Sequence, residues 1–283
     1  MKGKYFQLSS ARLVYRLLLA ASITIPGNSL ASWSDNIEGG ARSSGVGNAS
    51  VTIEDFWGIN NNQAGINKIK NICTGLYSTN HFLLKELTSV GLGVIIPTHA
   101  GVFGFSVDYS GYNLNNSAKA AIAYGKAFGA KLSAGIKLDF VREGYGESYG
   151  AQHLITFEVG FIAHLTERFC IGFHTFNPIP FYFDHGLPII PSIYRLGLSY
   201  QLARSFTGYL ECEQITNLHA IIRAGFECSF NQKVYGRIGI IGFPYEMTVG
   251  LGFILDRLEV DIASSFHQYL GYSPQISFIY FFK

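Results

Sequence analysis

Most of the chain reads as short segments in which apolar and polar side chains alternate. In residues 131–140, for example, Lys137 lies between Ile136 and Leu138, and residues 257–266 repeat the pattern. A side-chain period of two is that of a β-strand with one apolar and one polar face. The sequence therefore predicts an all-β fold made of many strands.

The alternating segments are about 9 to 12 residues long, which is the length a tilted strand needs to cross a bilayer. We expect about 14 of them, an even number as in bacterial single-chain barrels. They begin near Ile72, Thr88, Ala100, Ala118, Lys131, Gln152, Arg168, Ser192, Ser205, His219, Lys233, Glu246, Arg257 and Gln275. A soluble β-sandwich shows the same alternation, so this pattern alone leaves sandwich and transmembrane barrel both open.

The connections between segments favour the barrel. Those after even-numbered segments look tight, at residues 97–99, 128–129, 165–167, 203–204, 231–232 and 256. Those after odd-numbered segments look longer, at residues 80–87, 111–117, 141–151, 177–191 and 266–274. Outer-membrane barrels have this asymmetry, with short turns in the periplasm. The last segment, SPQISFIYFFK, also resembles the aromatic C-terminal signal that the outer-membrane assembly machinery recognises. We therefore expect a transmembrane antiparallel β-barrel in the outer membrane, with a periplasmic N-terminus.

The first residues have the features of a secretory signal peptide. Four basic residues precede an apolar run at residues 17–25, which is too short to span a bilayer as a helix, and Ser29 and Ala31 supply small residues for cleavage. We expect residues 1–31 to be removed. Of the 21 basic residues in the chain, 17 then remain against 19 acidic ones, so the sequence offers no nucleic-acid-binding surface.

Residues 40–66, GARSSGVGNASVTIEDFWGINNNQAGI, fit neither a helix nor a strand pattern. A barrel of about 14 strands is wider than the roughly eight-stranded barrel that its own side chains can fill. A glycine-rich segment before the first strand can follow a compact path inside such a barrel. We expect residues 32–70 to form a plug and residues 71–283 the barrel. The acidic and amide residues of this plug are expected to pair with inward cations, namely Arg195, Arg223, Arg237 and Arg257.

This stretch resembles the start of the outer-membrane family that includes the FadL-like long-chain fatty-acid transporters and the PorV/PorQ proteins of type IX secretion. That family has a Gly-rich run, then GNAGVA, an acidic pair, an aromatic residue and Asn-Pro-Ala-Gly. The residues that fill these places, and that the resemblance implies as plug and gate, are Gly45, Gly47, Asn48, Glu54, Asp55, Trp57, Asn62, Ala64 and Gly65. Gln63 stands where the family has proline.

The sequence gives little support for catalysis or for metal binding. The segment at residues 45–50 approximates a dinucleotide-binding loop, but no preceding strand or βαβ unit encloses it. The eight histidines form no HExxH motif, and His153, His174 and His185 lack an accompanying nucleophile signature. The sequence therefore predicts no catalytic residue, no metal site and no cofactor. Four free thiols are expected, because a hairpin turning near Asn217 would place Cys212 opposite a residue near Arg223.

Three functions remain open. The first is passage or binding of a hydrophobic or amphipathic small molecule past the plug. The second is docking in a type IX-like secretion system, and the third is lipid modification. The loop at residues 177–191 is a possible patch for a ligand or a partner protein, through Ile179, Phe181, Tyr182, Phe183 and Leu187. The expected partners are outer-membrane lipid and either a hydrophobic ligand or a secretion-system protein.

Overall fold

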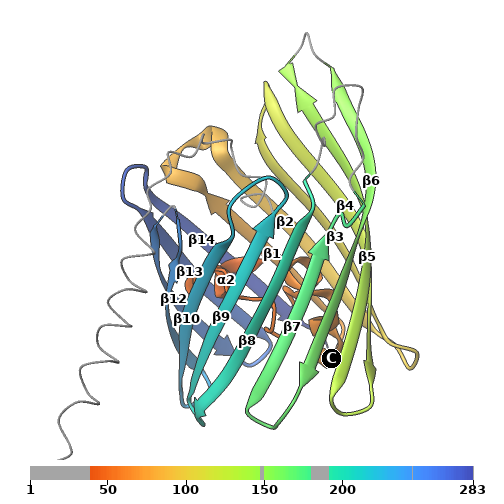
Figure 1. Ribbon diagram of the computed structural model, residues 1–283, viewed down its shortest axis with the longest axis vertical. Coiled ribbons are helices and arrows are strands. Elements are labelled where there is room, and N and C mark those ends of the chain that lie inside the picture. The colour runs from red at the N-terminus through yellow and green to blue at the C-terminus, as the bar shows by residue number, and fades with distance from the viewer. Residues whose placement is uncertain (1–38, 147–149, 180–190, 244, 283) are drawn as a thin grey trace, which may run out of the picture. The chain divides into compact units, whose positions relative to one another are not determined.

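The computed structural model describes residues 39–146, 150–179, 191–243 and 245–282, and these form a closed antiparallel barrel of fourteen strands (Figure 1). The strands are β1 (Cys73–Asn80), β2 (Thr88–Pro97), β3 (Val102–Tyr112), β4 (Asn115–Phe128), β5 (Leu132–Tyr145), β6 (Ala151–His164), β7 (Phe169–Phe176), β8 (Ile193–Ala203), β9 (Phe206–Ile215), β10 (Ile221–Phe230), β11 (Val234–Ile241), β12 (Glu246–Leu255), β13 (Leu258–His267) and β14 (Gly271–Phe281). The predicted fold class and strand number are confirmed. The predicted signal peptide lies outside the described residues.

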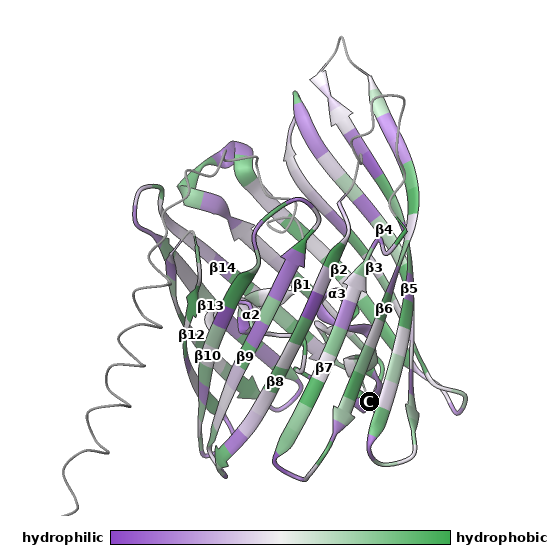
Figure 2. Ribbon diagram, viewed as in Figure 1, coloured by the Kyte–Doolittle hydropathy of each residue, from purple (hydrophilic) through white to green (hydrophobic). Residues whose placement is uncertain are grey.

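Each strand pairs with its sequence neighbours, and the barrel closes where β1 pairs with β14, with Cys73 opposite Phe281. The predicted alternation is confirmed in β5, where Lys137 is fully buried while the neighbouring Ile136 and Leu138 are 52% and 56% exposed. Figure 2 shows the resulting change of hydropathy from residue to residue along the strands. At these positions of β5 the polar side chain therefore faces the lumen and the apolar side chains face outward.

Three of the predicted long loops are wrong, because the strands continue into them. The loops predicted at residues 111–117, 141–151 and 266–274 shorten to 113–114, 146–150 and 268–270. Strands β4, β5 and β6 consequently project beyond the rest of the barrel (Figure 1). Strand pairing depends on backbone hydrogen bonds and does not require an apolar face. Polar cross-strand contacts support this extension, such as the hydrogen bond from Ser117 to Glu143.

Cys212 lies opposite Ile222, next to Arg223 as predicted, and all four cysteines are free thiols. One inward residue was placed wrongly. Arg257 was expected to face the lumen, but it lies in the turn before β13, 3.9 Å from the Asp256 carboxylate. Strand β13 begins at Leu258, one residue later than the pattern suggested, so its first lumenal carboxylate is Glu259.

Residues 39–71, called here the N-terminal segment, lie inside the barrel. They form α2 (Gly40–Gly45), α3 (Gly58–Asn61) and the 3-10 helix η2 (Gln63–Lys68). Two further 3-10 helices, η3 (His81–Leu83) and η4 (Lys85–Leu87), connect β1 to β2. Among the residues that the structure describes, no helix is long and apolar enough to cross a membrane.

Candidate functional site

The N-terminal segment follows a tight path that its glycine and asparagine residues make possible. Gly47 and Asn48 follow α2 with positive φ values of 69° and 56°, a region that glycine and asparagine tolerate better than other residues. Asn62 caps η2, because its side-chain oxygen accepts a hydrogen bond from the Ala64 amide at 3.1 Å. The segment thus reverses direction within the lumen without a long helix.

The wall that faces this segment is made of glycines. On eleven of the fourteen strands, a Cβ atom added to one lumenal glycine would lie within 3.1 Å of an atom of the segment. These glycines are Gly75, Gly93, Gly104, Gly125, Gly135, Gly160, Gly172, Gly197, Gly225, Gly239 and Gly250. Glycine inside a strand commonly marks such close approach of another backbone. The segment is therefore packed against the wall around most of the barrel.

A first polar anchor joins the segment to β8 and β9. The Arg195 guanidinium, only 3% exposed, donates hydrogen bonds to the Asn61 carbonyl at 3.1 Å and to the Ser50 hydroxyl at 2.9 Å. Its Nε also donates to Glu211 at 2.6 Å, and Glu211 accepts a hydrogen bond from the Val51 amide at 2.8 Å. This buried ion pair thus binds both limbs of the segment, and each charge has a partner, as burial requires.

A second anchor joins α2 to β10. Arg42 donates two hydrogen bonds to the Glu227 carboxylate, at 3.0 and 2.8 Å, and lies 3.3 Å from Asp55 of the same segment. Glu227 also accepts from Arg237, which in turn binds Asp261. Burial raises the pKa of Asp55 above its usual range, against the opposing effect of Arg42. Asp55 therefore pairs with a cation of its own segment and not with a wall arginine, which corrects the predicted pairing.

A third anchor joins the segment to the adjacent strands β6 and β7. The Asn62 amide donates to the backbone carbonyl of Phe161 at 3.2 Å and to that of Phe173 at 3.3 Å, so it bridges β6 and β7. Gln63 donates to Glu158, which also contacts Lys137 at 3.0 Å. A proline at position 63 could not make this side-chain bond, so the departure from the family pattern coincides with a polar wall contact.

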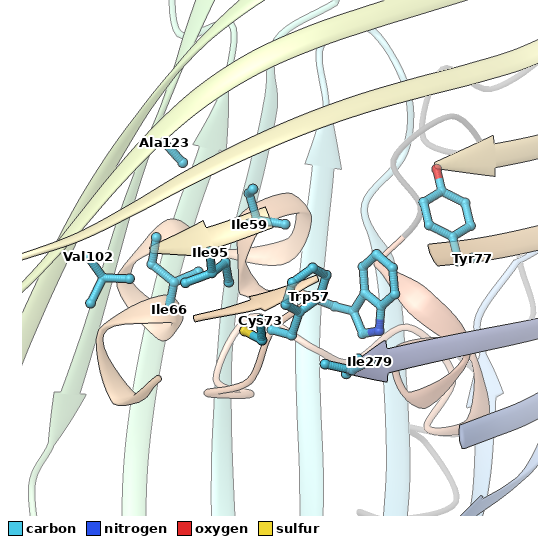
Figure 3. Close-up of a cluster of buried hydrophobic side chains, with 10 residues drawn as sticks. Trp57, Ile59, Ile66, Cys73, Tyr77, Ile95, Val102, Ala123 and Ile279 are labelled. Carbon is cyan, nitrogen blue, oxygen red and sulfur yellow. The ribbon is translucent and has the colours of Figure 1, made fainter. Parts of the chain in front are cut away.

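Apolar side chains hold the middle of the segment. Trp57 packs edge-on against Phe56, with ring centroids 4.8 Å apart, and against Tyr77 of β1 at 5.3 Å. Figure 3 shows Trp57, Ile59 and other labelled members of this cluster converging between the segment and the wall. Aromatic burial of this kind is a large favourable term in packing.

The nine residues predicted as plug and gate all belong to this segment and lie together. Eight of them are buried in the lumen or lie close to its wall. Glu54 is partly exposed and contacts the end of β6, where its carboxylate lies 2.9 Å from His164, and it also lies 3.9 Å from Lys68. In the outer-loop patch, Ile179 is 64% exposed, whereas Phe181, Tyr182, Phe183 and Leu187 lie outside the described residues.

The sequence reasoning missed the wall glycines and the anchoring roles of Arg42 and Glu211. Glycine at inward positions of successive strands was the available signal. Some of the charges on the wall pair across strands, as in the contact of Arg223 with Glu213 at 2.6 Å. Pattern alone could not show which of them also bind the segment.

The histidines weighed for catalysis are far from a catalytic arrangement. His174 is buried against Glu158 at 3.0 Å, and His153 stacks on Phe140 with ring centroids 5.7 Å apart. His185 lies outside the described residues. Within the described ranges, no group of three or more His, Cys, Asp or Glu side chains is placed to hold a metal ion.

Several solved structures share this architecture. A Pseudomonas aeruginosa FadL homologue matches with a TM-score of 0.67 and 11% sequence identity, covering 86% of this chain and 98% of that chain. The Ralstonia pickettii toluene transporter TbuX matches at 0.66 and 12% identity, covering 88% and 100%. The Pseudomonas putida toluene transporter TodX matches at 0.63 and 14%, covering 87% and 99%. No protein-family model and no curated protein matches the sequence. The chain therefore has the FadL-like fold of the hydrocarbon-transporter barrels.

Proposed function

We propose that this chain is a non-enzymatic outer-membrane barrel that binds or passes a hydrophobic or amphipathic small molecule, with the N-terminal segment as its plug. The observation that carries the proposal is the segment itself, which packs against lumenal glycines of eleven strands in a barrel with the fold of toluene transporters. A segment seated in this way blocks the direct route through the lumen.

The outer surface supports a place in a bilayer. Outward side chains in the middle of the strands are apolar and more than half exposed, including Leu92, Val107, Ile136, Leu196 and Val249. Soluble monomers rarely expose a continuous apolar surface of this extent. An apolar band around a closed barrel matches the hydrocarbon layer instead.

The lumen supports an apolar cargo. Toward the long-loop end, an apolar cluster faces inward from five adjacent strands. It contains Val141, Phe176, Ile193 and Ile215, with Leu154 and Leu218 packed against it. This cluster lies past the charged anchors that hold the N-terminal segment, on the side from which a molecule outside the cell would come. An apolar cluster on this side favours contact with an apolar molecule over contact with a polar one.

The test is uptake of radiolabelled toluene and of a long-chain fatty acid by cells that express the protein. Ile193→Ser should lower uptake, because it places a hydroxyl within the apolar cluster. Tyr194→Ser is the matched control, since the adjacent side chain points outward and is 40% exposed. Heat-modifiable migration on gels would show that both variants fold. Uptake that is independent of the protein, or lowered equally by both variants, would refute transport.

Purification from native outer membranes separates this function from docking to a secretion system. A co-purifying apolar small molecule is expected. A stoichiometric protein partner, without a bound small molecule, would favour the docking function instead.

A further inference from the structure

The short turns of the barrel carry a ring of basic side chains. Each of the five hairpin turns that lead into β5, β7, β9, β11 and β13 contains one cation directly before or two residues before the strand. These residues, called here the basic rim, are Lys131, Arg168, Arg204, Lys233 and Arg257. Because a cation recurs at about the same structural position in five successive turns, the positive charge characterises this whole end of the barrel.

The basic rim is not neutralised by its surroundings. Lys131, Arg168, Arg204 and Lys233 are exposed and form no ion pair with any residue that the structure describes. Among the described residues, Arg257 is the rim cation with an ion-pair partner, Asp256 at 3.9 Å, while Glu167 precedes Arg168 in the sequence without forming an ion pair with it.

The opposite end of the barrel differs. There the described loops and strand ends combine the cations Lys85 and Arg142 with the carboxylates Glu86, Glu143 and Glu246. Arg142 is also engaged, because it donates to the Asn116 side chain at 2.8 Å. The excess of free positive charge therefore belongs to the short-turn end.

Aromatic side chains cover the outer wall directly beside the rim. Phe169 and Tyr200 face each other across β7 and β8, with ring centroids 6.3 Å apart, and Phe206 stacks on Phe226 at 5.3 Å. Aromatic residues at this height occupy the membrane–water interface in barrels. Cations one residue away then lie at the level of lipid phosphate groups.

One turn forms a hollow of about 680 Å³, lined by Thr166, Glu167, Arg168, Phe169 and Tyr200. The Thr166 hydroxyl oxygen accepts hydrogen bonds from the Arg168 and Phe169 amides, at 3.2 and 3.0 Å. Its own proton is consequently available to an acceptor in the hollow. A guanidinium, a hydroxyl donor and two aromatic rings suit a phosphate attached to an acyl chain.

We propose that the basic rim binds the phosphate groups of anionic phospholipids, and that the hollow at Arg168 holds one such lipid with its acyl chain against Phe169 and Tyr200. Bound lipid would fix the height and tilt of the barrel, because the rim surrounds most of its short-turn end. The inference rests on the proposal that the barrel spans a bilayer, but it is independent of transport. Among the described residues that line the hollow, Glu167 is the one carboxylate. Its negative charge opposes the binding of a further negatively charged group there.

The test is native mass spectrometry of the full-length protein in neutral detergent, titrated with phosphatidylglycerol or phosphatidylethanolamine of identical acyl chains. We expect more phosphatidylglycerol adducts, and fewer of them at high salt. Arg168→Gln with Arg204→Gln should lower phosphatidylglycerol occupancy several-fold. The matched control, Lys85→Gln with Arg142→Gln, removes two charges at the other end and should leave occupancy unchanged.

Glu167→Gln tests the headgroup chemistry. It should raise phosphatidylglycerol occupancy, because it removes the repelling carboxylate. Loss of phosphatidylethanolamine adducts instead would show that Glu167 binds an ammonium group, and would overturn the proposal in favour of a zwitterionic lipid. Equal binding of both lipids to the unaltered protein, or equal loss in both double variants, would also overturn it. Heat-modifiable migration on gels confirms folding of each variant. If the rim binds lipid but cells that express the protein show no uptake, the transport proposal is refuted and the lipid proposal is not.

Discussion

Arg42 and Glu227 lie 185 residues apart in the sequence, yet they form a two-point ion pair, with N–O distances of 3.0 and 2.8 Å. The pair links the first helix of the N-terminal segment to β10 on the wall. It joins two charged side chains directly, whereas Arg195, a buried cation of the same interface, reaches the segment through carbonyl and hydroxyl oxygens.

Arg42→Ala should loosen the N-terminal segment without unfolding the barrel. Glu227 keeps Arg237 as a partner, so the expected cost is about 1 to 3 kcal/mol, which is that of leaving one buried group poorly paired. Planar-bilayer recordings should show brief openings that the unaltered protein lacks. Arg257→Ala is the control, because its pair with Asp256 is long and exposed and should contribute little. Openings of equal frequency in both variants would mean that the ion pair does not hold the segment.

Gly225→Ala should disturb the same interface through the wall. The added Cβ would collide with the Val46 carbonyl, whereas a Cβ at Gly236 would meet its nearest atom, on Phe230, at 3.6 Å. Overpacking typically costs about 1 to 3 kcal/mol, so Gly225→Ala should lower the temperature at which the barrel unfolds on gels. Gly236→Ala should leave that temperature nearly unchanged. If the two variants melt together, the segment does not pack against the wall as described.

Removing residues 40–60 while keeping β1 should give a folded barrel that conducts ions. The deletion takes away the atoms that meet eight of the eleven wall glycines, and the buried charges Arg195 and Glu211 then face water. Conductance across planar bilayers is the measurement, with heat-modifiable migration as proof of folding. A folded deletion variant that stays closed would show that the segment does not block the lumen. Asp55→Ala with Asn62→Ala should have a weaker effect of the same kind.

Ile136→Arg should be costly and Leu132→Arg nearly neutral. Both side chains face outward on β5, but Leu132 begins the strand beside Lys131, and Ile136 lies four residues deeper. Arginine facing lipid costs about 2 to 4 kcal/mol at the bilayer midplane and about 0 to 1 kcal/mol near the interface. Denaturant unfolding in lipid vesicles measures both. Equal costs would contradict an apolar belt at this height.

Closure should weaken as the pH rises. The pKa of Asp55 is raised by burial, so the closed state binds a proton more tightly than a state in which Asp55 is hydrated. Openings should accordingly become more frequent as the pH rises above the ordinary aspartate pKa of about 4. Asp55→Asn should remove this dependence, because the amide stays neutral. A pH response that survives in Asp55→Asn would assign it to another group.

The barrel could be predicted from the sequence because the alternation of polar and apolar residues within each strand identifies that strand. In β5 the alternation of Lys137 with Ile136 and Leu138 is local, and a strand that alternates in this way has one polar and one apolar face. Strand ends were less certain, since β3, β4 and β5 continue past the apolar belt on backbone pairing.

The sequence predicted which residues form the site but not their contacts. The glycines and amides of residues 40–66 indicated a compact plug, and the structure brings those residues together in the lumen. Their partners could not be predicted, because several cations were possible partners for Asp55. Its actual partner, Arg42, belongs to the same segment and lies only 13 residues away in the sequence. The rings that pack beside Trp57 are likewise set by how the segment turns within the lumen.

The sequence by itself determined the strand number, the two faces of each strand and the presence of a glycine-rich segment ahead of the first strand. Only the tertiary structure decided that Arg195 binds the carbonyl of Asn61, that Gly225 leaves room for Val46, and that five separate turns bring their cations to one rim. The physical reason is the range of the interactions. Alternation is a property of neighbouring residues, whereas closure of the barrel sets contacts between residues more than a hundred positions apart and gives no periodic signal along the chain.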